Sequence, residues 1–260
     1  TDRLSSQLNS QTREEKDRFS ADISFVGSMY HKNSYDDIKD KLPPYLRGYF
    51  DAAMLAQLNI YGDNIIDELL TVDILKQLSE FVDFRQDKRA FSDIRLVFES
   101  TFLGFKLANI ERVKTLNLLA KKNKVALYTD EQDTSLINVD FKGTVDYMND
   151  MPKVFNNSSI NLNMTIRNIR TGIPLRVWDI LGAGGFLLTN YQIELTDYFK
   201  NEESIVYYED MYDCCKKAEY YLLHEDKRRQ IAAKGHELVS KKHSYINRVK
   251  YILDVIGKMS

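Results

Sequence analysis

The chain has 260 residues, of which 43% are hydrophobic and 28% are charged, as expected of a globular protein with a sizeable core. The net charge of −2 excludes the overall positive field of a nucleic-acid-binding protein. No apolar run reaches the roughly 18 residues of a membrane span. The adjacent Cys214 and Cys215 suit neither a disulfide nor a metal motif, so we expect a reducing, cytoplasmic setting.

The first half of the chain consists of three segments that differ in their pattern of apolar residues. Residues 1–20 lack apolar periodicity and predict a linker or domain edge, and their polarity does not fit a signal peptide. "ADISFVGS", residues 21–28, predicts a short buried strand that ends at Gly27. Residues 34–122 have apolar residues at helical spacing and predict a largely helical insertion after this strand. Within it, residues 43–62 predict one helix and residues 90–122 predict one or two long helices.

From Lys124 onward, predicted strands and helices alternate. Strands are expected over residues 124–130, 138–143, 159–165, 185–190 and 203–208, and helices over 146–158, 174–183, 209–224, 225–242 and 244–257. This order is typical of βαβ units, so we predict an α/β fold with a mostly parallel sheet. Ligands of such sheets lie outside the carboxyl ends of the strands. The candidate site residues therefore lie in the segments 27–32, 129–131, 143–146 and 164–176.

One segment, "IRTGIPLRVWDILGAGGFLLTN" (residues 169–190), predicts a loop, a helix and a strand in succession. Gly172 allows unusual backbone conformations in the loop, and Pro174 favours a helix start. The free amides of the first helical turn, together with the helix dipole, can bind a phosphate. Arg176 could add a charge-assisted contact to the same phosphate.

Arg176 and Asp179 are three residues apart, so their side chains lie on one side of the predicted helix. They can form a surface ion pair, which would contribute less than about 1 kcal/mol. Alternatively, Asp179 accepts hydrogen bonds from the hydroxyl groups of a sugar, as acidic residues do in dinucleotide sites. A nucleoside diphosphate would use both charges at once. The residues alone leave both interpretations open.

The segment "FKGTVDYMNDMPKVFNNSSINLNMTIRNIRTGIPLRVWDILGAGGFLLTNYQIELTDYF" resembles the glycosyltransferases related to the spore-maturation protein CgeB. The resemblance is dense from Asp140 to His243 and includes "ADISFVGSMY" (residues 21–30). It implies the GT-B fold, in which two Rossmann-like domains face each other and the second binds a nucleotide sugar. Residues 21–260 would then be this C-terminal, nucleotide-sugar-binding domain. The N-terminal, acceptor-side GT-B domain would be missing from the chain.

The resemblance also implies roles for single residues. Asp179, in "WDILGAG", would hold the ribose hydroxyl groups, and Arg176 is the catalytic candidate. Thr144 and Val145 would lie beside the base, while Gly27 and Ser28 would face the diphosphate. The substrate-binding candidates are Gly27, Ser28, Tyr30, Thr144, Val145, Thr165, Gly172, Ile173, Pro174, Leu175 and Asp179. His31 and Lys32 could reach the diphosphate. Either Arg167 or Arg170 could clamp it, although the sequence favours solvent-facing positions for both arginines.

One position departs from the family pattern. The first acid of a two-glutamate motif falls on Thr171, which leaves a retaining or an inverting outcome open. No metal or cofactor is expected, because no pair of histidines has metal-ligand spacing and GT-B enzymes stabilise the leaving group with helix amides and basic side chains.

We therefore predict a glycosyltransferase that transfers a sugar from a nucleoside diphosphate sugar, with UDP as the expected nucleotide, to an unknown glycan, protein or small-molecule acceptor. The alternatives are a GT-B-fold UDP-sugar epimerase and an inactive nucleotide-sugar-binding or scaffold module. The helical insertion is expected to contact the acceptor or a partner.

Overall fold

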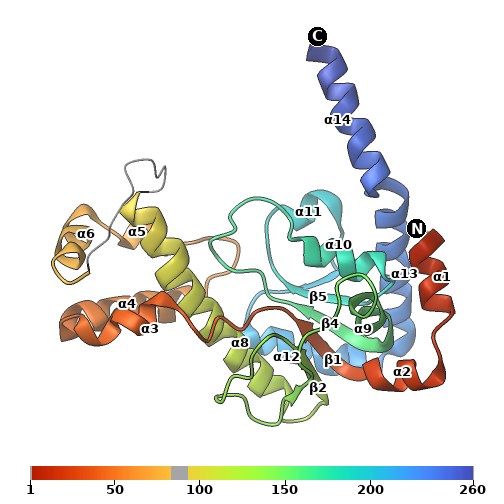
Figure 1. The fold of residues 1–260 in the computed structure, drawn as a ribbon, viewed down its shortest axis with the longest axis horizontal. Coiled ribbons are helices and arrows are strands. Elements are labelled where there is room, and N and C mark those ends of the chain that lie inside the picture. Colours follow the sequence, from red (N-terminus) through yellow and green to blue (C-terminus); the bar gives the residue numbers. More distant parts are fainter. Residues whose placement is uncertain (1, 83–92, 260) are drawn as a thin grey trace.

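The computed structural model describes residues 2–82 and 93–259, and it has one six-stranded sheet (Figure 1). The strands are β1 (Ala21–Val26), β2 (Val125–Tyr128), β3 (Asp140–Phe141), β4 (Ser158–Asn163), β5 (Leu187–Asn190) and β6 (Val206–Tyr208). Their order is β3-β2-β1-β4-β5-β6, and all of these neighbours pair in parallel. The predicted α/β class with a Rossmann-like parallel sheet is confirmed. Five of the six strands lie within their predicted segments, and β4 begins one residue before its segment, at Ser158.

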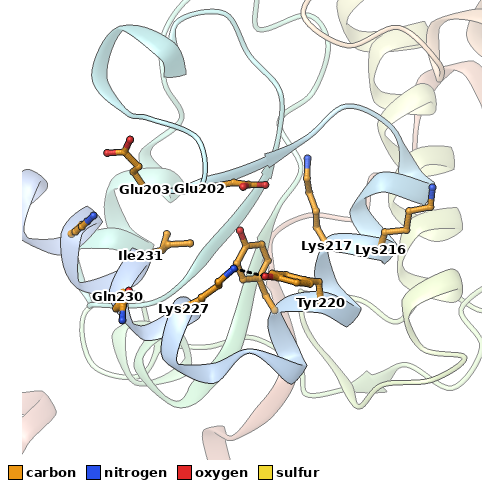
Figure 2. A pocket seen from close by; sticks show the side chains of 10 residues that line it. Glu202, Glu203, Lys216, Lys217, Tyr220, Lys227, Gln230 and Ile231 are labelled. Carbon is orange, nitrogen blue, oxygen red and sulfur yellow. Dashed lines mark hydrogen bonds between the residues drawn. The ribbon is translucent and has the colours of Figure 1, made fainter.

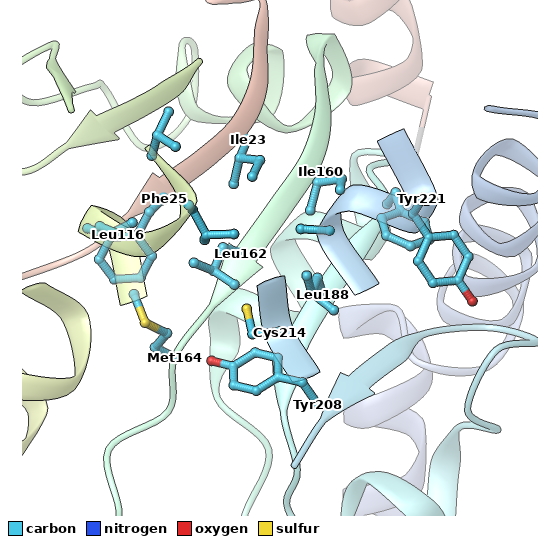
Figure 3. Close-up of a cluster of buried hydrophobic side chains, with 14 of the residues drawn as sticks. Ile23, Phe25, Leu116, Ile160, Leu162, Met164, Leu188, Tyr208, Cys214 and Tyr221 are labelled. Atoms are coloured by element: carbon cyan, nitrogen blue, oxygen red, sulfur yellow. The ribbon is translucent and has the colours of Figure 1, made fainter. Parts of the chain in front are cut away.

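Helices cover both faces of the sheet, because the strands of a parallel sheet are apolar on both faces. The helices that flank it are α8 (Phe105–Leu119), α9 (Met151–Asn157), α10 (Leu175–Gly182), α11 (Leu195–Tyr198), α12 (Met211–Leu223) and α13 (Glu225–Lys242). Successive strand residues point to opposite faces. Phe25 therefore packs with Leu116 of α8 and Cys214 of α12 (Figure 3), whereas Val26 packs on the other face with α9 and α10. Cys214 and Cys215 are free thiols, and burial raises the pKa of both.

The chain between β1 and β2 has a hydrophobic core of its own. It contains α3 (Ser34–Ile38), the short turn η1 (Lys39–Lys41), α4 (Pro44–Gln57), α5 (Ile66–Leu69), α6 (Val72–Ser79), α7 (Ile94–Val97) and the π-helical η2 (Phe98–Gly104), which continues into α8. Leu46, Phe50 and Phe98 are buried together here. We call residues 34–82 and 93–107 the helical subdomain; it projects from one end of the sheet (Figure 1).

The expected bounds of the insertion need one correction. Leu116 and Leu119 of α8 pack in the core under the sheet, not in the core of the helical subdomain. The second half of α8 is thus the crossover helix that a right-handed β1–β2 connection requires. Residues 90–92 of the predicted long helix lie outside the described residues.

The predicted linker or domain edge over residues 1–20 is mostly helical where the structure describes it. Helices α1 (Asp2–Asn9) and α2 (Arg13–Phe19) occupy this region. Thr12 and Glu15 form a reciprocal capping box at the start of α2, and Phe19 is buried in the core on the face of the sheet that α9 and α10 cover. Glu15 also pairs with Lys153 of α9. Tertiary contacts with α9 stabilise these helices, and such contacts leave no apolar periodicity in the sequence.

The last helix, α14 (Tyr245–Met259), extends away from the body of the molecule (Figure 1). Tyr245, Val249 and Ile252 are exposed along it. Within the described ranges, no helix combines the length and apolar character needed to cross a bilayer.

Candidate functional site

The strand order places a topological switch point between β1 and β4. From β1 the chain continues to β2, toward one edge of the sheet. From the neighbouring strand β4 it continues to β5, toward the opposite edge. The two connections diverge at the carboxyl ends of these strands, which is where ligands bind in open α/β sheets. The loops that leave this point are residues 27–33 and 164–174.

Two buried side chains of α8 bind these loops, and one of them, Arg112, joins the two. Arg112 donates one hydrogen bond to the carbonyl oxygen of Ser28 and another, of 2.6 Å, to that of Met164. Asn109 donates to the carbonyl oxygen of Met29 at 2.9 Å. We did not predict either residue. The available signal was their spacing of three, which places both on one face of the helix.

In the loop after β1, only some of the predicted site residues are free to meet a ligand, and the others contact side chains of the protein. Ser28 is exposed beside the half-buried Gly27. Tyr30 has a positive φ of 50°, and its ring stacks on Phe105 of α8 with the centroids 4.6 Å apart. Each of the next two residues, His31 and Lys32, contacts the Glu131 carboxylate, at 2.7 and 2.6 Å. Hydrogen bonds from Lys32 and then from His31 lower the pKa of Glu131.

The segment after β3 reaches α10. Gly143 has a φ of 73°, and its carbonyl oxygen accepts a hydrogen bond of 3.0 Å from the amide of Thr129. Thr144 is exposed, and Val145 is half-buried against the core that contains α10. The hydroxyl of Tyr147 donates to the Asp179 carboxylate at 2.9 Å. The residues predicted to lie beside a base and the acid predicted to hold a ribose are thus brought together.

Thr165 occupies a structural position. Its amide donates to the side chain of Asn190 at 2.9 Å, and its carbonyl oxygen accepts from the same side chain at 2.8 Å. Its hydroxyl accepts a third hydrogen bond from Asn163 at 3.0 Å. Since both backbone groups and the hydroxyl have protein partners, Thr165 holds the loop on β5 and has little left to offer a nucleotide.

The start of α10 follows the expected pattern. Gly172 has a φ of 91°, a conformation that favours glycine, and Pro174 is the N-cap residue. The amide of Gly172 donates to the carboxylate of Glu194, so that group is already engaged. Ile173 packs against the core, whereas Leu175 is exposed. The first intrahelical hydrogen bond runs from Val177 to Pro174, so the amides before it are those that a phosphate would use.

Arg176 and Asp179 form a half-buried ion pair, with Nη1 and Oδ2 3.4 Å apart. Arg176 also donates to the sulfur of Met151 and lies 5.5 Å from the ring centroid of Phe155, and both residues belong to α9. Burial lowers the pKa of Arg176, and burial likewise raises the pKa of Asp179. Arg176 therefore contacts α9 and Asp179, and none of its described contacts is with the loop after β1.

Arg167 and Arg170 bind the helical subdomain and α8. Arg167 is 8% exposed and pairs with Glu111 of α8 at 2.9 Å. Arg170 pairs with Asp67 of α5 at 3.0 Å and with Glu99 of η2 at 3.4 Å. The solvent-facing position that the sequence favoured is therefore wrong for Arg167, because α8 supplies a buried partner for it.

A large basic pocket lies elsewhere, between α12, α13 and the residues that precede β6 (Figure 2). It has a volume of about 550 Å³, and Lys216, Lys217, Lys227 and Lys234 line it. Two of these lysines have partners, since Lys217 binds Asp213 and Lys227 binds the hydroxyl of Tyr220. The pocket contains none of the predicted site residues. In the part of the chain that the structure describes, no group of three His, Cys, Asp or Glu side chains could hold a metal ion.

The sequence matches one known family over most of the site. The model of the family described as "Glycosyl transferase-like" covers residues 109–254, which is more than half of the chain. The chain belongs to this glycosyl transferase-like family. Membership supports the predicted glycosyltransferase domain, while the closer relationship to CgeB stays a prediction. No curated protein matches this glycosyl transferase-like chain.

Several solved structures are similar to part of the chain at low identity. The crystal structure of TarM is 14% identical and covers 55% of this chain and 31% of its own, with a TM-score of 0.44. Alr3699/HepE of Anabaena, in complex with UDP-glucose, is 11% identical, covers 56% and 44%, and has a TM-score of 0.46. T4 phage BGT, in complex with its UDP-glucose substrate, is 14% identical, covers 65% and 50%, and has a TM-score of 0.41. The chain thus spans half or less of the length of each of these proteins.

Proposed function

We propose that this chain is the donor-binding domain of a CgeB-like glycosyltransferase with GT-B architecture, and that its donor is a nucleoside diphosphate sugar. UDP is the nucleotide we expect. Family membership supports the class of reaction, and the switch point between β1 and β4 supports the position of the donor. The acceptor is a glycan, a protein or a small molecule.

The observation that carries this proposal is the placement of Asp179. Its carboxylate lies one turn into α10, accepts a hydrogen bond from Tyr147, and is half-buried beside Arg176. A carboxylate whose pKa is raised by burial, at the ligand-binding edge of the sheet, is typical of a functional group. We assign it to the ribose hydroxyl groups, with Tyr147 fixing the direction in which the carboxylate points.

The remaining candidates would contact other parts of the donor. Thr144 and Val145 precede Tyr147 and would contact the base. The amides of Leu175 and Arg176, which precede the first intrahelical bond, would bind a phosphate. Gly27 and Ser28 would face the diphosphate from the opposite side of the switch point, with Tyr30 behind them on Phe105.

In this proposal, Arg176 influences donor binding through its effect on the Asp179 carboxylate. Its guanidinium lowers the pKa of that carboxylate against the larger effect of burial, so it favours the ionised form that accepts hydrogen bonds from a ribose. We therefore treat Arg176 as a positioning residue, and its predicted role at the leaving diphosphate as the alternative to be tested. The leaving group would then rely on helix amides.

Transfer to an acceptor requires a second surface opposite this edge. In the GT-B architecture an acceptor-side domain supplies it, and we propose that such a domain completes the enzyme. The helical subdomain borders the same edge through Arg170, so it can form part of the acceptor-side wall.

The test compares UDP with 2′,3′-dideoxy-UDP by calorimetry, using wild type and Asp179→Asn. We expect wild type to bind UDP about tenfold more tightly than the dideoxy analogue, because the analogue lacks the hydroxyl groups that Asp179 would accept from. Asp179→Asn should lose most of this discrimination. A wild type that binds neither compound would refute the donor site, and an unchanged ratio in the variant would refute the ribose role alone.

A further inference from the structure

We propose that the basic pocket between α12 and α13 (Figure 2) binds a phosphate monoester that carries an apolar group. The pocket contains none of the residues predicted to bind the nucleotide. Its third wall, residues 202–203, precedes the amino end of β6 and does not follow the carboxyl end of a strand. The proposal therefore does not rest on the proposed function.

One face of each helix lines the pocket. The lining residues are at positions 216, 217, 220 and 221 of α12, and at positions 227, 230, 231 and 234 of α13. Residues three and four positions apart share one side of a helix, so the two helices present these faces to the same hollow. The volume of about 550 Å³ lies within the roughly 300–1,000 Å³ of pockets for organic ligands and is far more than a bare phosphate fills.

The base of the pocket holds a hydroxyl group without a partner. Tyr221 is only 3% exposed, and its ring packs on Phe186 with the centroids 4.9 Å apart. Its hydroxyl points away from that core (Figure 3), has no partner among the described residues and, unlike the hydroxyl of Tyr208, is not enclosed by the protein. Burial raises the pKa of Tyr221 to about 12, so the hydroxyl keeps its proton and can donate to an anion.

The lysines of the pocket keep positive charge for a ligand. Lys217 is neutralised by Asp213, 2.7 Å away. Lys227 donates to a neutral tyrosine hydroxyl, and Lys216 and Lys234 have no side-chain partner within the described ranges. Three ammonium groups are thus not matched by an ion pair. Ammonium groups bind phosphate as point charges, and hydrogen bonds between ionised groups are roughly twice as strong as neutral ones.

The rest of the lining selects a small phosphate with an apolar group. Glu202 and Glu203 also line the pocket and are exposed, so a ligand with many negative charges would meet their repulsion. Four lysines against two glutamates leave a net positive charge that suits one dianionic phosphate. The ring of Tyr220, which is 36% exposed, and the side chain of Ile231 offer apolar contacts to the remainder of the ligand.

Three variants of the full chain test the proposal. Tyr221→Phe removes the unpartnered hydroxyl and keeps the buried ring. Lys234→Met removes one charge and keeps an apolar stem, whereas Glu203→Gln removes a charge of the opposite sign. Lys242→Met is the matched control, because Lys242 is an exposed lysine of the same helix α13 that lies outside the pocket. Thermal denaturation checks that all four proteins are folded.

The probes are phenyl phosphate, inorganic phosphate and phenol, followed by calorimetry at about pH 7.5, where a phosphate monoester is mostly a dianion. We expect wild type to bind phenyl phosphate about tenfold more tightly than inorganic phosphate, and phenol not at all. Binding of phenyl phosphate should weaken as the ionic strength rises. Tyr221→Phe and Lys234→Met should each weaken it about fivefold, and Glu203→Gln should strengthen it about twofold. Lys242→Met should match wild type.

The proposal is overturned if wild type binds no phenyl phosphate, or if it binds phenyl phosphate no better than inorganic phosphate. It is also overturned if Tyr221→Phe and Lys234→Met bind phenyl phosphate as wild type does, because the anion then lies at another part of the chain. None of these results bears on the donor site, which the comparison of UDP with its dideoxy analogue tests separately.

Discussion

The guanidinium of Arg167 and the carboxylate of Glu111 lie 2.9 Å apart, and their side chains are only 5% and 2% exposed. The hydroxyl of Tyr61 donates to the same carboxylate at 3.0 Å, and the Arg167 guanidinium lies 3.8 Å from the Tyr61 ring centroid. Arg167 belongs to the loop after β4, Glu111 to α8 and Tyr61 to the helical subdomain. One buried cluster therefore joins the sheet edge, the crossover helix and the subdomain.

Breaking this pair should destabilise the protein strongly. Glu111→Gln leaves the Arg167 charge buried without its partner, and removal of one member of a buried ion pair costs about 3–5 kcal/mol. Urea unfolding followed by circular dichroism measures the change. The double variant Glu111→Leu with Arg167→Met should recover much of the loss, because it removes both charges and fills the space with apolar groups.

The matched control is the exposed pair of Lys241 and Glu237, 2.5 Å apart on α13. Glu237→Gln should unfold at the same urea concentration as wild type, because water already solvates both charges. Equal unfolding of wild type and Glu111→Gln would show that the buried pair is not what holds the loop after β4.

The ionised carboxylate of Asp179 should lower the free energy of unfolding at neutral pH. Burial raises its pKa in the folded state above the ordinary 3.8, so the folded state binds this proton more tightly than the unfolded state. Its contribution to stability is then largest at low pH and is lost as the pH rises through the folded pKa. We expect Asp179→Asn to melt at a higher temperature than wild type at pH 7, with a difference that shrinks toward acid. A variant less stable than wild type at pH 7 would contradict this.

Ionisation of Asp179 should strengthen donor binding, although it lowers the stability of the fold. An ionised Asp179 accepts from ribose hydroxyl groups, so UDP-glucose affinity should fall as the pH decreases through the raised pKa of Asp179. UDP-glucose is the suitable probe because its phosphates carry no further proton in this range. In Asp179→Asn, calorimetry should find weaker binding with no such pH dependence.

Arg176→Leu separates the two roles considered for this arginine. If Arg176 supports Asp179, its removal raises the pKa of Asp179 further, and the loss of UDP-glucose binding moves to higher pH. If Arg176 instead contacts the diphosphate, UDP binding weakens while uridine binding does not, and the pH profile stays in place. Calorimetry with uridine, UDP and UDP-glucose at several pH values decides between them.

Gly62 should tolerate no side chain. It has a φ of 84°, and a Cβ atom would lie 2.7 Å from the ring of Tyr191. Gly62→Ala is therefore expected to destabilise the protein by about 1–3 kcal/mol, measured by urea unfolding. The control is Gly48→Ala, which lies inside α4 with open space around it and should stabilise by about 0.5–1 kcal/mol. Similar effects at both positions would mean that the subdomain does not pack tightly on Tyr191.

Local sequence patterns were sufficient for much of the sheet. The apolar run around Ile23 and the alternating apolar and polar residues around Ile160 predicted strands. Pro174 and the following apolar spacing predicted α10. The sequence missed α1 and α2, whose stability comes from contacts with α9, and it placed the end of the insertion too late because both halves of α8 have the same helical periodicity.

By itself, the sequence determined the α/β class, the strands and the segments that follow them, because these depend on hydrophobic period and on local backbone preferences. Only the tertiary structure decided which polar groups meet. It paired Arg167 with Glu111, used all three hydrogen-bonding groups of Thr165 to hold the loop, and brought Tyr147 to Asp179. A charged side chain is drawn to whichever opposite charge or hydrogen-bond partner the fold places within a few ångströms, and that partner can lie anywhere along the chain.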